Sequence, residues 1–203
     1  MALSPSFAGL ILAAGESSRM GQDKALLPWQ GETFLSSALR VLQSVTELVI
    51  VVAGENEPEL APIVYANAAY IIRNPHPEQG QFSSLQRGVE EVLNRGRDAA
   101  IVTLVDRPAP AVETLQQLKD EFQNASDQIW AVVPEFNGKH GHPVVIGREM
   151  IEAFLRAPAG SNARDVEHAR QNRIRYLAVN DPHVAINVNT PEEFQNLSTG
   201  IFT

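Results

Sequence analysis

The sequence predicts an α/β protein with a mostly parallel sheet. Short, continuous apolar runs typical of buried strands alternate with amphipathic segments, and a length of 203 residues suits a single domain. The clearest apolar runs are residues 10–14, 47–54 and 99–105. The order strand, helix, strand over the first 54 residues predicts a right-handed parallel crossover. We therefore expect one domain over residues 1–203.

The remaining elements follow from the same periodicities. Helices are expected at 34–42 with Thr33 as its cap, at 57–65 with interrupting prolines, and at 85–93, 112–122 and 148–155. A further helix is expected to start within residues 157–165 and to run to about 171. Further strands are expected at 69–72, 129–134 and 174–179. Asn137-Gly138 is a strong hairpin signal and predicts an antiparallel excursion. Thr190, with Pro191 and two glutamates after it, predicts the start of a last helix.

The composition narrows the classes of function. A formal net charge of −8 argues against nucleic acid as a partner. With no cysteine, the chain has no disulfide, thiolate metal site or cysteine nucleophile, and it fits a reducing, cytoplasmic location. Residues 1–8 lack a basic leader, and the apolar run after them is too short for a signal sequence or a membrane span. No membrane partner is expected.

The first informative motif follows the first strand. The apolar run breaks at Gly15 into a loop of small residues that leave backbone N–H groups accessible to a ligand. Arg19 and Lys24 add two cations suited to phosphate oxygens. The pattern favours a phosphate-binding loop; the alternative is a strand followed by a solvated turn with two incidental cations.

Neither the dinucleotide-binding nor the P-loop signature can be written over this loop. The pattern that does fit is Leu12-Ala13-Ala14-Gly15-x-Ser17-x-Arg19-Met20-Gly21-x-x-Lys24. It resembles the opening motif of the molybdopterin nucleotidyltransferases, and more broadly of enzymes that join an NTP to a phosphorylated acceptor. The resemblance implies a Rossmann-like three-layer sandwich and a nucleotide-binding role for Leu12, Ala13, Ala14, Gly15, Ser17, Arg19, Gly21 and Lys24, with Arg19 and Lys24 catalytic.

A second motif runs from Asn74 to Leu85 as a proline-rich loop, a glycine and two serines. Small hydroxyl and backbone groups at a helix N-terminus suit a helix cap or the edge of a nucleobase. A plain N-cap at Ser83 or Ser84 is the alternative. The pattern resembles the family's base-binding loop, which implies that Asn74, Gly80, Ser83 and Ser84 belong to the nucleotide site.

The third motif is Asp106, which follows a buried strand at a position where open α/β sheets bind ligands. A carboxylate there suits Mg²⁺, which takes oxygen ligands from protein, phosphate and water. Asp106 is also placed to begin a turn or cap the next helix, and Arg107 reads as a solvated charge. The closing stretch resembles the family's last motif, which implies that Asn187 and Asn189 face the metal with Asp106, where relatives often carry aspartates.

The expected acceptor site is formed by later loops. By resemblance, Gly141-His142-Pro143 admits the acceptor, although a structural turn explains these residues almost as well. Arg164 is a candidate phosphate contact, or part of a solvated basic face. Family members often have an acidic residue after the nearby glycine, where Ser161 and Asn162 stand here.

The resemblance implies a Mg²⁺-dependent transfer of a nucleoside monophosphate to the phosphate of molybdopterin, with a molybdoenzyme as a possible recipient of the product. CTP is favoured because relatives that use pyrimidines show the Ala14 seen here, whose methyl narrows the base slot. Two alternatives stay open: transfer to a sugar or alditol phosphate, and a non-catalytic chaperone that binds nucleotide and cofactor.

Overall fold

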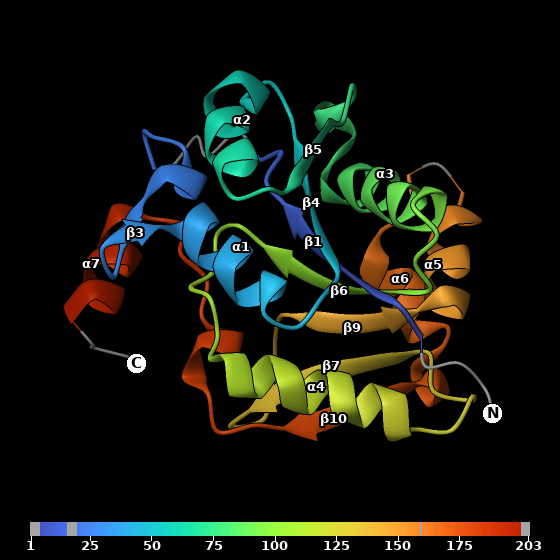
Figure 1. Ribbon diagram of the computed structural model, residues 1–203. Helices are drawn as coiled ribbons and strands as arrows, with labels where there is room; N and C mark the ends of the chain where they lie inside the picture. Colours follow the sequence, from blue (N-terminus) through green and yellow to red (C-terminus); the bar gives the residue numbers. More distant parts are fainter. Residues whose placement is uncertain (1–4, 16–19, 159, 200–203) are drawn as a thin grey trace.

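The main sheet is flanked by helices on both faces (Figure 1). The computed structural model describes residues 5–15, 20–158 and 160–199. The strands lie in the order β10-β7-β9-β6-β1-β4-β5, and β8 pairs with β7 off this path. Their bounds are β1 Phe7–Leu12, β4 Leu48–Ala53, β5 Tyr70–Arg73, β6 Ala99–Leu104, β7 Ala131–Phe136, β8 Lys139–His140, β9 Val144–Gly147 and β10 Ile174–Ala178. A two-stranded ribbon, β2 Pro28–Trp29 with β3 Glu32–Thr33, lies outside this sheet.

Strand pairing confirms the predicted mostly parallel sheet. Strand β1 pairs in parallel with both β4 and β6, which places it in the interior of the sheet. Strand β9 runs antiparallel to both of its neighbours, β6 and β7. Strand β8 turns back along β7 through Asn137-Gly138, whose φ angles are 49° and 75°. The predicted hairpin and the antiparallel excursion are therefore confirmed.

Two helical layers complete a three-layer sandwich. The helices are α1 Phe34–Gln43, α2 Glu57–Ala66, α3 Gln81–Asn94, α4 Val112–Asn124, α5 Arg148–Leu155, α6 Ala163–His168 and α7 Pro191–Thr199. Because side chains alternate along a strand, Phe7 and Ile11 of β1 pack in the cluster with α1, α2 and α4. Leu10 and Leu12 pack in the cluster with α3, α5 and α6. None of the helices in the described part of the chain has the length and hydropathy needed to cross a bilayer.

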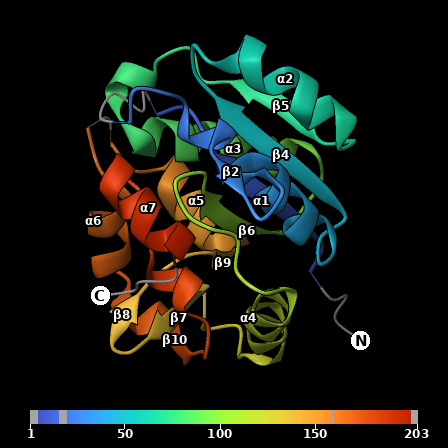
Figure 2. The same ribbon diagram turned by 90° about the vertical axis from the view of Figure 1, so that its left-hand side faces the viewer.

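A third apolar cluster attaches α7 to the sandwich. Trp29 and Phe34 meet edge to face at 5.9 Å, and Phe34 meets Phe194 of α7 at 6.1 Å. Val188, just before α7, is fully buried in the same cluster. Figure 2 faces the side of the molecule on which α7 lies. The packing of α7 fixes the position of the segment that carries Asn187 and Asn189.

Several elements differ from their predicted bounds. Strand β1 begins at Phe7 and ends at Leu12, although Ala13 still donates its N–H to the Val52 carbonyl at 2.8 Å. The predicted interruption of α2 is wrong: the helix is continuous, since Pro58 lies in its first turn and Pro62 removes only one backbone bond. Thr33 caps α1 as predicted, accepting a hydrogen bond from the Ser36 N–H at 3.1 Å.

Helix α3 begins four residues earlier than predicted. Its N-cap is Gly80, whose φ of 90° lies in the region that favours glycine. Ser83 and Ser84 are therefore inside the helix, and the alternative that one of them is its N-cap is wrong.

Candidate active site

Lys24, Asp106 and Asn189 meet beyond the carboxyl end of β6. The Lys24 Nζ donates to Asn189 Oδ1 at 2.8 Å and lies 3.5 Å from Asp106 Oδ2. The Lys24 and Asp106 side chains keep 13% and 24% of their surface exposed, so a ligand can still reach them. Lys24 is 82 positions from Asp106 and 165 positions from Asn189 in the sequence, so the fold brings the three residues together. We refer to them as the Lys24 cluster.

The start of α7 positions Asn189. The Glu193 carboxylate accepts the N–H of Asn189 at 2.6 Å and of Thr190 at 3.1 Å, while Thr190 Oγ1 accepts the Glu193 N–H at 3.2 Å. This reciprocal arrangement is a capping box, and it confirms Thr190 as the predicted helix cap. In addition, the Val188 N–H donates to the Asp106 carbonyl at 2.8 Å. The last segment of the chain is therefore joined directly to the end of β6.

The Lys24 cluster fits a hard divalent cation. Asp106 Oδ1 is buried and has no hydrogen-bond partner among the described residues, which is a costly state for a carboxylate oxygen. The described residues hold no group of three or more acidic or histidine side chains that would form a metal cage of their own. Asp106 and Asn189 therefore suit a cation such as Mg²⁺, whose other ligands come from phosphate and water.

Asn187, the other predicted amide ligand, lies elsewhere. It is exposed and borders a hollow together with Phe136, Lys139 and Glu193. Of the two asparagines, the structure joins only Asn189 to Lys24 by a hydrogen bond.

Of the predicted phosphate-binding loop, Ser17 and Arg19 lie outside the described residues. Ala13 is buried, and the backbone N–H groups of Ala14 and Gly15 donate to no other described residue. Gly21 has a φ of 70°, a conformation that favours glycine. Accessible N–H groups beside Lys24 suit an anionic ligand.

Arg107 is not a solvated charge, so that interpretation of the sequence is wrong. Its guanidinium is largely buried and donates to the carbonyls of Val184 at 3.2 Å and Ile186 at 3.5 Å. Burial lowers the pKa of Arg107, while the charge of Asp106 opposes that shift. Its Nε has no hydrogen-bond partner among the described residues. Arg107 thus ties the segment before α7 to the end of β6, next to Asp106.

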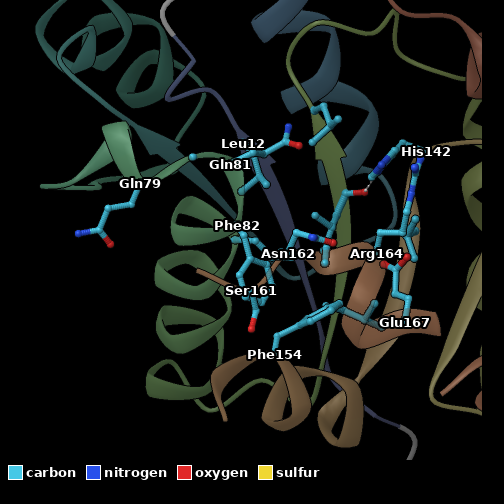
Figure 3. A pocket seen from close by; sticks show the side chains of 17 residues that line it. Leu12, Gln79, Gln81, Phe82, His142, Phe154, Ser161, Asn162, Arg164 and Glu167 are labelled. Carbon is cyan, nitrogen blue, oxygen red and sulfur yellow. Dashed lines mark hydrogen bonds between the residues drawn. The ribbon is translucent and has the colours of Figure 1, made fainter. Parts of the chain in front are cut away.

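A cavity of about 450 Å³ lies on the face of the sheet that α3, α5 and α6 cover. Leu12 and Leu104, the last residues of β1 and β6, form part of its lining. Four of the predicted site residues border it, namely Leu12, Gly80, His142 and Arg164 (Figure 3). Leu104 is two residues before Asp106, so the cavity reaches the end of the strand that Asp106 follows.

The Asn74 loop is held by its own hydrogen bonds. The Asn74 Nδ2 donates to Ser83 Oγ at 2.8 Å and to Ser84 Oγ at 3.0 Å, and Asn74 Oδ1 accepts the His76 N–H at 3.0 Å. Asn74 and Ser84 are buried, whereas Gly80 is exposed at the cavity. Asn74 and the two serines therefore position the loop, and Gly80 is the residue that it offers to a ligand.

The Gly141-His142-Pro143 corner packs tightly on the closing segment. A Cβ at Gly141 would lie 1.8 Å from the Val184 carbonyl oxygen, so only glycine fits there. His142 donates its N–H to the same oxygen at 2.9 Å and precedes a cis proline. Burial and the charge of Arg107 lower the pKa of His142 to about 4, so its ring is neutral near pH 7. Its Nδ1 faces the Val102 carbonyl at 3.4 Å, which favours the proton on Nδ1 and leaves Nε2 as an acceptor.

Comparison with known proteins decides the family. The model of the MobA-like NTP transferase domain matches residues 9–174. The chain belongs to the MobA-like NTP transferase family. The molybdenum cofactor guanylyltransferase of Xanthomonas euvesicatoria is 29% identical over 97% of both chains. The molybdenum cofactor cytidylyltransferase of Escherichia coli is 26% identical, covering 91% of this chain and 92% of that protein.

Solved structures share the fold of this MobA-like chain. The Rv0371c protein of Mycobacterium tuberculosis superposes with a TM-score of 0.81 at 24% identity, covering 96% of this chain and 98% of that one. A complex of that protein with manganese superposes with a TM-score of 0.74 at 22% identity, covering 95% and 97%. These likenesses confirm the predicted Rossmann-like architecture.

Asn56 is a residue of this MobA-like site that sequence reasoning missed. Its Nδ2 donates to the Ala13 carbonyl at 2.9 Å and to Asp23 Oδ2 at 2.6 Å, and its Oδ1 accepts the Gly54 N–H at 3.0 Å. Asp23 Oδ1 in turn accepts the Ala25 N–H at 2.8 Å. One amide therefore joins the end of β1 to the residue before Lys24. No local motif marks Asn56, because its partners are 33 and 43 residues away in sequence.

We expect Asn56→Asp to raise the KM for the nucleoside triphosphate about 10-fold or more, because a second carboxylate would face Asp23 and the Ala13 carbonyl. Adding Asp23→Asn restores one donor between the two side chains and should recover part of the loss. Steady-state kinetics of both variants, with exposed Asn172→Asp as the control, measure this. An Asn56→Asp enzyme with an unchanged KM would exclude a positioning role for this amide.

Proposed function

We propose that the chain transfers CMP from CTP to the phosphate of molybdopterin and releases pyrophosphate. The observation that carries this proposal is the Lys24 cluster: a lysine, a carboxylate with an unpaired buried oxygen and an amide converge beside accessible loop N–H groups. The family comparisons support transfer to the molybdenum cofactor but include both guanylyltransferases and a cytidylyltransferase.

In this reaction an oxygen of the acceptor phosphate attacks the α-phosphorus of the triphosphate. The bond from the α-phosphorus to the bridging oxygen of the β-phosphate breaks, and pyrophosphate leaves with the electron pair. Such a displacement depends on alignment and charge neutralisation more than on covalent catalysis. Lys24, and by prediction Arg19, stabilise the developing negative charge, while the N–H groups of Ala14, Gly15 and Gly21 bind phosphate or base.

Asp106 and Asn189 would hold the cation, for which we propose Mg²⁺. When bound, it polarises the α-phosphate as a Lewis acid. Asn56 and the capping box of α7 keep Lys24 and Asn189 in place for this chemistry. His142 and Arg164, which line the cavity, are proposed to receive the acceptor, with Gly141 and Pro143 fixing the corner that carries His142. Gly80 is proposed to receive the base, on a loop that Asn74, Ser83 and Ser84 hold in place.

The choice of CTP rests on Ala14. Its methyl group follows the buried end of β1, where a smaller residue would leave more room for a purine.

Pyrophosphate release from CTP, GTP, ATP and UTP, each with Mg²⁺ and with or without molybdopterin, tests the proposal. We expect release from CTP only when molybdopterin is present. Release from GTP instead would show that the nucleotide donor is GTP and leave the proposed reaction unchanged. Release only with a sugar phosphate would show that the acceptor is not molybdopterin. Nucleotide binding without release in any combination would contradict the proposed reaction and favour a carrier of nucleotide and cofactor.

A further inference from the structure

Glu167 of α6 borders the cavity, close to Arg164. Its side chain is partly buried, and no hydrogen bond or ion pair joins its carboxylate to another described residue. Burial raises the pKa of Glu167, while the charges of His168 and Arg164 oppose that shift. Its carboxylate oxygens are therefore available to accept hydrogen bonds from a ligand in the cavity.

The walls of the cavity suit a flat heterocycle. Phe82 from α3 and Phe154 from α5 meet edge to face at 5.8 Å, and Leu85, Val144 and Ile146 extend the apolar lining. Figure 3 shows Phe82 beside α3 and Phe154 at the lower side of the pocket, with Arg164 and Glu167 of α6 on its right-hand side. A largely apolar pocket with a few placed polar groups is typical of ligand sites.

The hydrogen-bond acceptor atoms that line the cavity indicate which heterocycle fits it. Glu167 offers two carboxylate oxygens, and neutral His142 offers Nε2. Two adjacent N–H groups of a ligand can donate to the two oxygens of one carboxylate, as an arginine guanidinium does in a bidentate pair. A 2-amino-4-oxopyrimidine ring presents such a pair in its 2-amino group and neighbouring ring N–H. Cytosine does not, because its amino group lies beside a ring nitrogen that is itself an acceptor.

We propose that Glu167 recognises the 2-amino-4-oxopyrimidine edge of a substrate bound in this cavity. That edge occurs in a pterin and also in guanine. The substrate that carries it is therefore either the pterin-containing acceptor or a guanine nucleotide. With CTP as the donor, the source is the pterin of the acceptor. This assignment of the source rests on the proposed function, whereas the fit of the edge to the cavity does not.

Binding of free pterins to the full chain, measured by calorimetry, tests the proposal without a reaction. We expect 6-hydroxymethylpterin to bind the wild-type protein at least about 10-fold more tightly than 6-hydroxymethyllumazine, in which an oxo group replaces the 2-amino group. Glu167→Gln should reduce that ratio to about two or less, because its amide offers one acceptor and one donor. Glu167→Asp should recover part of the ratio, and exposed Glu149→Gln should leave it unchanged.

GTP and CTP titrations with the same variants identify the source of the edge. Weaker pterin binding with unchanged CTP binding in Glu167→Gln assigns it to the acceptor, whereas a loss of GTP binding alone assigns it to the nucleobase. Equal binding of pterin and lumazine to the wild-type protein, with GTP binding unaffected by Glu167→Gln, overturns the proposal. A retained pterin preference without pyrophosphate release would count against the proposed reaction and leave the role of Glu167 intact.

Discussion

Lys24→Ala is expected to lower kcat about 100- to 1,000-fold, the usual effect of removing one group that stabilises charge in a transition state. The Lys24 Nζ lies in the Lys24 cluster, 3.5 Å from Asp106 Oδ2 and 2.8 Å from Asn189 Oδ1, at the end of the loop that we propose binds phosphate. No other described side chain places an ammonium group at that point. The initial rate of pyrophosphate release at saturating nucleotide measures the change.

The matched control for this variant is Lys139→Ala. Lys139 is exposed on β8 and forms no hydrogen bond or ion pair with Lys24, Asp106 or Asn189, so its removal alters the net charge by the same amount and leaves the contacts of the Lys24 cluster in place. Both variants should keep the far-ultraviolet circular dichroism spectrum of the wild type. If Lys24→Ala retains the wild-type kcat, Lys24 is not the group that stabilises the transferring phosphate.

Asp106→Asn should have a larger effect, on the order of 1,000-fold or more in kcat, because bound cations contribute several kcal/mol of transition-state stabilisation. The substitution preserves shape, but it replaces the unpaired buried Oδ1 and removes the charge that attracts the metal. We therefore expect the Mg²⁺ concentration for half-maximal rate to rise sharply or saturation to disappear. A Mg²⁺ titration of the rate measures this, and Mn²⁺ binding followed by electron paramagnetic resonance measures it without turnover.

Asp127→Asn is the matched control, since Asp127 is exposed in the turn after α4. It should leave both the rate and the Mn²⁺ affinity within about two-fold of wild type, as surface substitutions usually do. Unchanged Mn²⁺ binding in Asp106→Asn would place the cation elsewhere and remove the basis for its role in the Lys24 cluster.

Local patterns were sufficient to predict much of the fold. Continuous apolar runs located β1, β4 and β6, because strands buried on both faces need little alternation. Thr33 and Thr190 located helix starts, because a side-chain cap is a local interaction. The start of α3 was missed, since its cap is a glycine with a positive φ and carries no side-chain signal.

Prediction of the site from the sequence was limited because its residues meet through long-range contacts. The motifs placed Lys24, Asp106 and Asn189 at strand ends and loops, but only the fold shows that Asn189 contacts Lys24 whereas Asn187 borders another hollow. Arg107 looked like a surface charge because its partners are backbone carbonyls at least 77 residues away. Glu167 was passed over for a similar reason, because its exposure to the cavity depends on how α6 packs beside α3 and α5.

The most direct test of nucleotidyl transfer to molybdopterin follows radioactive phosphorus from the nucleotide into the products. The chain is incubated with molybdopterin, Mg²⁺ and CTP carrying ³²P at either the α or the γ position, and the products are separated by chromatography. Attack on the α-phosphorus predicts that the α label appears in a molybdopterin dinucleotide and the γ label in pyrophosphate, in equal amounts. A γ label in the acceptor, or no label in any acceptor product with each of the four nucleotides, would contradict nucleotidyl transfer to molybdopterin.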